Sequence, residues 1–198
     1  MFRTRLVHRL IAVAATVAAA LVVSPVPAAH ASAVGVIWNY ASYWCADLPD
    51  AGPTLNSYVY EHPSCNPTSN DNQAWAIDYT GDLYSEGLPA FTIRNVKSGQ
   101  CMDLPGTDAV ARGTRVWMHD CDRTFNDNQQ WVYQPYDAYP GFGLVMNVKT
   151  LLDPSPTLCL DVDGWGGQQT GLPLTVYTCT GYGWANNGTD DHLWSIPR

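Results

Sequence analysis

Apolar and polar residues alternate along several short segments, which predicts β-strands that are buried on one side. In GTRVWMHDC (113–121), the apolar Val116 and Met118 are expected to face the core. Their neighbours Trp117 and His119 are then expected to face outward. No segment after residue 31 shows the long 3.6-residue period of an amphipathic helix, so the pattern predicts an all-β fold.

Two further segments resemble this predicted strand. GLPLTVYTC (171–179) alternates in the same way, whereas YVYEHPSC (58–65) is a weaker copy because Pro63 would end its strand. In the first of them, Leu174 and Val176 are expected to face inward, and Thr175 and Tyr177 outward.

Each predicted strand ends near a cysteine. The six cysteines form three successive pairs, and the two members of each pair are twenty positions apart. Six cysteines allow fifteen pairings, but a repeated unit favours the same local pairing each time. Each such bridge would close a loop of about twenty residues and stabilise the fold by roughly 3 kcal/mol. The predicted disulfides are Cys45–Cys65, Cys101–Cys121 and Cys159–Cys179.

Other residues repeat in register with these cysteines, which indicates three copies of a unit of about fifty residues. An aspartate stands two positions after each first cysteine, an asparagine precedes it, and a tryptophan motif follows the second. These are Asp47, Asp103 and Asp161; Asn39, Asn95 and Asn147; and NDNQAW (70–75), NDNQQW (126–131) and DDHLW (190–194). Short strands in three such units need one another to bury a common face.

The first 31 residues have the pattern of a secretory signal peptide, with a basic start, an apolar run and a small-residue end. Cleavage near Ala31–Ser32 would leave a single domain over 32–198, secreted into an oxidising environment that suits disulfides. The leader carries three arginines and no acid, so its removal changes the net charge from −8 to −11. That charge argues against nucleic acid and an anionic membrane as partners. Insertion into a membrane is not expected either.

The three copies of C-x-D-[LV], each with a second cysteine twenty residues on, and the N-Q-x-W motif resemble the ricin B-type lectin domain. Carbohydrate-binding modules of secreted actinobacterial glycanases share this fold. The resemblance covers about 36–197 and implies a β-trefoil, with lobes at about 36–80, 92–140 and 143–198 and one intra-lobe disulfide in each. It also implies one shallow sugar pocket per lobe.

The resemblance implies roles for the repeated residues. The aspartate and the asparagine of N-Q-x-W would bond sugar hydroxyls, the glutamine would steady the aspartate, and the tryptophan would be buried. The residue two before the second cysteine would offer an aromatic platform. The second lobe is expected to bind best; it has Asp103, Asn128, Gln129 and His119, with Trp117 beside them. The third lobe is ranked next and has Asp161, Tyr177 and Asp191, with His192 in place of the glutamine. The first lobe is ranked last and has Asp47, Asn72 and Gln73, with Pro63 at the platform position.

These roles predict a secreted lectin-like protein that binds galactose- or xylose-type glycans without a metal or other cofactor. The segment DVDG (161–164) lacks the later ligands of a calcium loop, and no hydrolase, nucleotide or dinucleotide motif is present, so an enzyme is not expected. The alternative is a trefoil that has lost sugar binding and serves as a protein-interaction or inhibitor module. Pro63 and His119 at platform positions favour this alternative, whereas the three aspartates oppose it.

Overall fold

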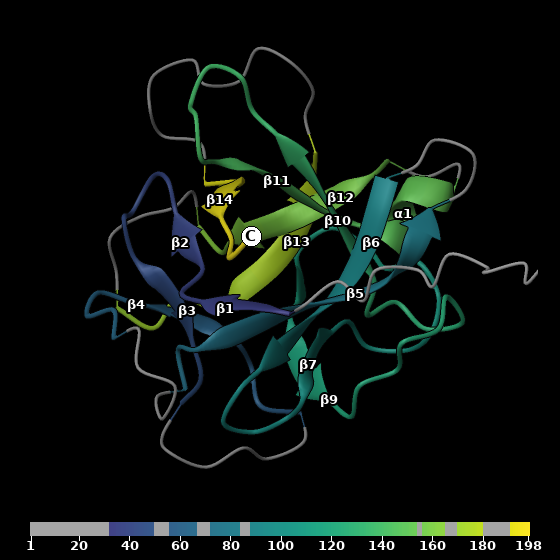
Figure 1. Cartoon of the computed structure of the whole chain (residues 1–198), viewed down its shortest axis with the longest axis horizontal. Helices are drawn as coiled ribbons and strands as arrows, with labels where there is room; N and C mark the ends of the chain where they lie inside the picture. The colour runs from purple at the N-terminus through teal and green to yellow at the C-terminus, as the bar shows by residue number, and fades with distance from the viewer. Residues whose placement is uncertain are drawn as a thin grey trace, which may run out of the picture.

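The computed structural model describes residues 32–49, 56–66, 72–83, 88–153, 156–164, 170–179 and 191–198; the predicted signal peptide lies outside them. Its strands surround a common centre, and one short helix lies at the periphery (Figure 1). The elements are β1 (Ala33–Gly35), β2 (Trp38–Asn39), β3 (Cys45–Asp47), β4 (Tyr60–His62), β5 (Trp75–Leu83), β6 (Leu88–Asn95), β7 (Cys101–Asp103), β8 (Thr114–Arg115), β9 (Trp117–His119), β10 (Trp131–Pro135), β11 (Gly143–Asn147), α1 (Val148–Leu152), β12 (Leu158–Val162), β13 (Leu174–Thr178) and β14 (Leu193–Ser195).

The strand pairing repeats three times and closes on itself. Within each unit, the strand of the first cysteine pairs with the strand that precedes the second: β3 with β4, β7 with β9 and β12 with β13. Between units, the strand of each motif tryptophan pairs with the first strand of the next unit: β5 with β6, β10 with β11 and β14 with β2. The β14–β2 pair joins the third unit to the first, so the three lobes form a closed ring.

Three backbone hydrogen bonds bring the lobes together at the centre. The Val59 N–H donates to the Val116 carbonyl (3.1 Å), Val116 donates to Leu174 (2.9 Å), and Leu174 donates back to Val59 (2.8 Å). All three residues are fully buried. This cycle of hydrogen bonds satisfies backbone groups that are buried away from water. Each lobe donates one bond and accepts one, so the three lobes make equivalent contacts at the centre.

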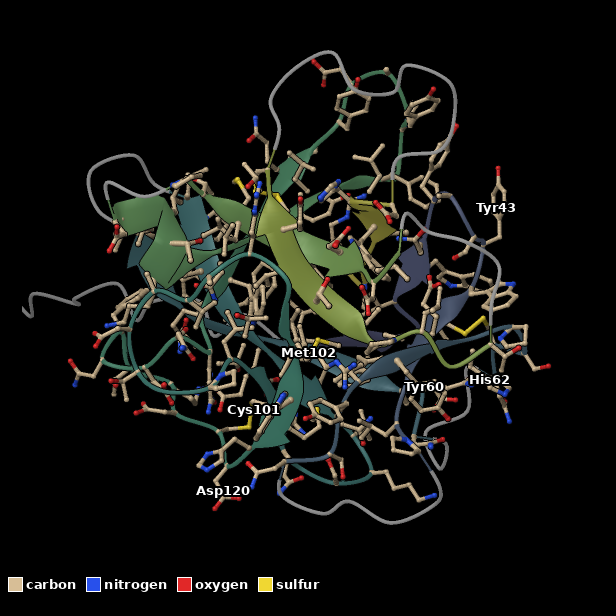
Figure 2. The ribbon with its side chains drawn as sticks, turned by 180° about the vertical axis from the view of Figure 1, so that it is seen from behind. Tyr43, Tyr60, His62, Cys101, Met102 and Asp120 are labelled. Atoms are coloured by element: carbon tan, nitrogen blue, oxygen red, sulfur yellow. A yellow bond between two sulfur atoms is a disulfide. The ribbon has the colours of Figure 1, made fainter. Side chains whose placement is uncertain are left out.

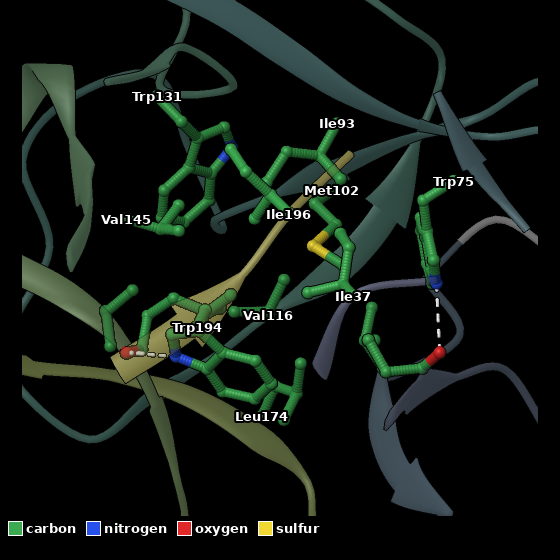
Figure 3. Close-up of a cluster of buried hydrophobic side chains, with 14 of the residues drawn as sticks. Ile37, Trp75, Ile93, Met102, Val116, Trp131, Val145, Leu174, Trp194 and Ile196 are labelled. Atoms are coloured by element: carbon green, nitrogen blue, oxygen red, sulfur yellow. Dashed lines mark hydrogen bonds between the residues drawn. The ribbon is translucent and has the colours of Figure 1, made fainter. Parts of the chain in front are cut away.

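The motif tryptophans Trp75, Trp131 and Trp194 are wholly buried in the hydrophobic core, as expected from the sequence (Figure 3). The Trp75 indole N–H donates to the Ala46 carbonyl at 2.9 Å, and the Trp194 indole donates to Leu160 at the same distance. The indoles of Trp75 and Trp194 therefore tie the last strand of their lobes to the strand of the first cysteine, whereas Trp131 Nε1 has no hydrogen-bond partner among the described residues.

The predicted all-β fold and β-trefoil architecture are confirmed, and so are the three disulfides, whose Cα atoms lie 5.9, 5.0 and 5.0 Å apart. Val116 and Met118 are buried, while His119 is exposed, as the alternation predicted. The prediction for Thr175 is wrong, because this side chain is only 3% exposed. Among the described residues, no helix has the length and apolar character needed to cross a membrane.

Candidate functional site

The three aspartates that follow the first cysteines occupy equivalent places, and each is held by neighbouring donors. The Leu48 N–H donates to Asp47 Oδ1 (2.7 Å), and the Leu104 N–H donates to Asp103 Oδ1 (2.8 Å). In the third lobe, the Thr175 hydroxyl donates to Oδ2 of the equivalent aspartate at 2.9 Å. The exposed fractions of Asp47, Asp103 and Asp161 are 4, 8 and 7%, so each carboxylate presents only an edge to solvent.

The glutamines of the first two lobes hold these carboxylates and the adjoining loops. The Gln73 amide donates to Asp47 Oδ2 at 2.9 Å and to the Ser64 carbonyl at 2.8 Å. In the second lobe, Gln129 accepts from the Asp122 N–H at 2.9 Å and donates to the Asp120 carbonyl at 3.0 Å. It also lies near enough to the carboxylate of Asp103 to lower the pKa of that group. Both glutamines thus bond the loop before the motif, and Gln73 also bonds its aspartate directly.

The two asparagines beside these glutamines bond to backbone atoms of nearby loops. Asn128 is fully buried; its amide donates to the Asp108 carbonyl at 3.0 Å, and its Oδ1 accepts from the Leu104 N–H at 3.3 Å. Asn72 is partly exposed, and its amide donates to the Leu48 carbonyl. The structure therefore places Asn128 behind the second pocket, where it fixes the loop, and leaves an accessible edge on Asn72 alone.

The platform of the first lobe is His62, not Pro63. Cys45 pairs with His62 in the β3–β4 register, just as the first cysteines of the other lobes pair with His119 and Tyr177. The expected placement of Pro63 is wrong because it assumed that equal cysteine spacing means equal loops. In the strand register, the partner of the aspartate follows it by 13 positions in the first lobe and by 14 in the other two. The partner of the first cysteine, in turn, precedes the second cysteine by three positions in the first lobe and by two in the others.

A second ring accompanies the platform in the first two lobes. Tyr60 lies opposite Asp47, with its ring centroid 6.5 Å from that of His62, and the two side chains are neighbours in Figure 2. Trp117 lies opposite Asp103 in the same way, and His119 follows it on the exposed face. The first lobe therefore has the residue arrangement of the second, although the sequence ranked it last.

The third lobe differs from the other two at the position opposite the aspartate and at the platform position. Opposite Asp161 stands the buried Thr175 instead of an aromatic ring, while Tyr177 is 40% exposed as the platform. The Arg112 guanidinium lies 5.5 Å from the centre of the Tyr177 ring. His192 replaces the glutamine, and its Nε2 is 3.5 Å from Asp161 Oδ1.

Burial changes the acidity of these carboxyl groups. Burial, with the nearby charge of Asp127, raises the pKa of Asp103 to about 6, although the Leu104 N–H, His119 and Gln129 oppose the shift. Burial and the neighbouring Asp161 raise the pKa of Asp191 to about 8. The second-lobe carboxylate is thus ionised at neutral pH, when it is a strong acceptor for hydroxyl groups.

Three asparagines that the sequence aligned without assigning a role position the motif loops. Asn95 donates from Nδ2 to the Asn72 carbonyl (2.7 Å), and Asn147 donates likewise to Asn128 (2.6 Å). Asn39 completes the set with a 2.7 Å bond to the carbonyl of Asp191. Each asparagine also accepts from backbone N–H groups two or three residues further on, so it links one lobe's pocket to the first turn of the next.

A cavity of about 660 Å³ lies between the end of β5, α1 and the loops that contain Asp108 and Phe125. Apolar Leu83, Phe125 and Leu152 line it together with Asp108 and Lys149. Its lining contains none of the predicted pocket residues. The lobe sites are built around a carboxylate edge and a ring.

Comparison with known proteins matches this arrangement to one family. Residues 89–197 match the ricin-type β-trefoil lectin domain model, and residues 29–118 match a related model described as ricin-type β-trefoil lectin domain-like. A search of curated proteins found no match.

Solved structures agree on the fold. A designed threefold-symmetric protein, ThreeFoil, is 17% identical over 83% of this chain and 98% of its own, with a TM-score of 0.62. The Macrolepiota procera ricin B-like lectin, solved with lactose, is 21% identical over 83% and 94%, with a TM-score of 0.55. The Rhizoctonia solani agglutinin is 17% identical over 87% and 99%, with a TM-score of 0.59. The chain belongs to the family of ricin-type β-trefoil lectin domains.

Proposed function

We propose that this protein is a secreted lectin that binds galactose- or xylose-type glycans, and that the first two lobes bind them without a metal. The observation that carries the proposal is the shared arrangement of those lobes. In each, a carboxylate edge next to a glutamine lies beside two rings, Tyr60 and His62 in one and Trp117 and His119 in the other.

This arrangement suits the two faces of a sugar. A carboxylate accepts hydrogen bonds from neighbouring hydroxyl groups, while a ring covers the apolar C–H face. Each disulfide joins the strand that carries the carboxylate to the segment after the ring, so little ordering is needed on binding. Shallow pockets of this kind bind individually weakly, and two of them on one chain strengthen binding to a polymeric glycan.

The same features favour a binding protein over an enzyme. A glycosidase needs two carboxyl groups set across a cleft that holds the scissile bond. In the first two lobes the carboxylate that follows the first cysteine presents only a narrow edge to solvent, beside rings. We infer that the chain binds glycans without cleaving them, and the three disulfides fit an oxidising, extracellular location.

A glycan array probed with the purified protein tests the proposal. The matched variant replaces Asp47 and Asp103 by Asn, which keeps their size and removes the charged acceptor. We expect the wild type to bind glycans that end in or contain galactose or xylose, and the double variant to lose that signal. A wild type that binds no glycan while folded, as judged by circular dichroism, contradicts the proposal.

The second candidate is a protein-interaction module, and a cluster of rings favours it. Tyr40 packs against Tyr139 and Phe142, with centroids 4.4 and 5.2 Å away, and Tyr136 stacks on Tyr139 at 5.7 Å. Beside them Tyr43 is 64% exposed and holds a positive φ of 59°, which is costly for a residue other than glycine. Binding to a protein partner that survives the aspartate substitutions but not Tyr43→Ser would support this function.

A further inference from the structure

The third lobe exchanges two neutral amides for two ionisable side chains. Where the first two lobes have Asn-Gln at 72–73 and 128–129, the third has Asp191 and His192. These residues meet Asp161, and one donor atom from each of the three lies within 4.8 Å of the others. The exchange therefore changes a glutamine-held carboxylate into a group of two carboxylates and an imidazole.

The distances place the imidazole between the two acids. His192 Nε2 is 3.5 Å from Asp161 Oδ1, and His192 Nδ1 is 3.7 Å from Asp191 Oδ1. The exposed fractions of Asp161, Asp191 and His192 are 7, 6 and 9%, so water reaches none of them freely. Two carboxylates so close together in a buried site repel each other, and either a proton shared between them or a cation relieves the repulsion.

One oxygen of this group has no hydrogen-bond partner. Asp191 Oδ2 is shielded from solvent, and no donor among the described residues reaches it. A buried carboxylate oxygen without a donor costs free energy, which a bound cation would remove. In the first lobe, by contrast, the glutamine amide fills the equivalent space and donates to the aspartate.

We propose that Asp161, Asp191 and His192 form a site for a divalent transition-metal ion, with Zn²⁺ as the representative of its class. Zinc takes imidazole nitrogen and carboxylate oxygen together, and three protein ligands leave it a fourth position. Calcium and magnesium are the poorer fit, because they prefer sets made of oxygen alone and calcium takes six to eight of them. The +2 charge would balance both carboxylates. The inference does not depend on sugar binding.

Titration calorimetry of the purified, chelator-treated protein with ZnCl₂ near neutral pH tests the site, with CaCl₂ in a parallel titration. The main variant is Asp191→Asn with His192→Gln, which restores the pair that the other two lobes carry and is therefore expected to fold. His119→Gln is the matched control, because it removes an exposed histidine outside the cluster. Circular dichroism checks that each variant has kept its fold.

The proposal predicts one zinc ion per chain, at least tenfold tighter than calcium, and a rise in melting temperature on zinc addition. The Asp191→Asn, His192→Gln variant should lose at least tenfold in zinc affinity, and the His119→Gln control should keep the wild-type value. If the wild type binds no zinc, or if the main variant binds it as tightly as the wild type, the proposal is wrong. If the control loses the binding instead, the ion lies on an exposed histidine and the proposal is equally wrong.

Discussion

Glu61 is a carboxyl group buried in β4 whose charge should make folding depend on pH. Glu61 is fully buried, and the only hydrogen bond to its carboxyl group among the described residues comes from the Ser42 hydroxyl to Oε1 at 2.6 Å. Burial raises the pKa of Glu61 from 4.5 to about 7, with Asp161 adding to the shift and Ser42 opposing it. The Glu61→Gln variant removes the ionisation and nearly keeps the shape.

The size of the change in folding stability follows from the pKa shift of Glu61. Because the folded state binds the proton more tightly than the unfolded state, stability falls as the pH rises from about 4.5 to about 7 and then levels off. A shift of this size corresponds to roughly 3 kcal/mol at about 1.36 kcal/mol per pH unit. Wild type should therefore lose about 3 kcal/mol relative to Glu61→Gln across this range.

Urea unfolding of both proteins, followed by the fluorescence of the buried tryptophans at several pH values, measures this difference. The comparison cancels the contributions of the other titrating groups, since both proteins share them. A difference in the free energy of unfolding that stays constant between pH 4 and 8 would show that Glu61 ionises as freely in the folded state as in the unfolded chain, and the reasoning from burial would fail.

Two further predictions concern the Asp78 ion pair and the first-lobe platform. Burial opposes the ionisation of Asp78, but hydrogen bonds from Arg94 and Ser32 outweigh it and lower the pKa of this carboxyl group. The contribution of Asp78 to the stability of the fold is therefore present at neutral pH and lost in acid. Urea unfolding should show that Asp78→Asn lowers the free energy of unfolding by about 1–3 kcal/mol at pH 7 and by less below pH 4. An equal cost at both pH values would refute this. His62→Ala should weaken glycan binding to the first lobe about two- to tenfold, whereas Pro63→Ala should leave it unchanged; the opposite result in a binding titration would restore Pro63 as the platform.

Much of the fold could be predicted because its determinants are local and repeated. The disulfides close within each unit, so the cysteine spacing alone favoured the pairing found for Cys101–Cys121 and its two counterparts. Period-two alternation identified the buried Val116 and Met118, because alternate side chains of a strand with one solvent-exposed face point into the core. The buried motif tryptophans followed from the family resemblance.

The errors arose where tertiary contacts decide the outcome. Equal spacing from Cys45 to Cys65 concealed two one-residue changes that cancel, and only the strand register identifies His62 as the platform. Thr175 was expected to face solvent, but it pairs with Arg115 of β8 and donates to the carboxylate of Asp161. Neither the compensating loops nor the partner strand can be read from alternation within one segment.

The role of the asparagines that precede the first cysteines was missed for a related reason. Each bonds to a motif loop of the preceding lobe, and for Asn39 that lobe lies 152 positions away in the sequence. The repeat alignment carried the signal, since asparagine recurs at 39, 95 and 147. Short polar side chains that recur before a turn are candidates for this capping role.

An NMR titration of the folded protein with lactose and with a xylo-oligosaccharide tests the central claim most directly. The ring resonances of His62 and His119 and the indole N–H of Trp117 report on the two proposed pockets, while the indole of Trp75 reports on the core. The account predicts saturable shifts at the pocket resonances with one of these sugars and almost none at Trp75. Shifts confined to other parts of the protein, or none with either sugar, would contradict it.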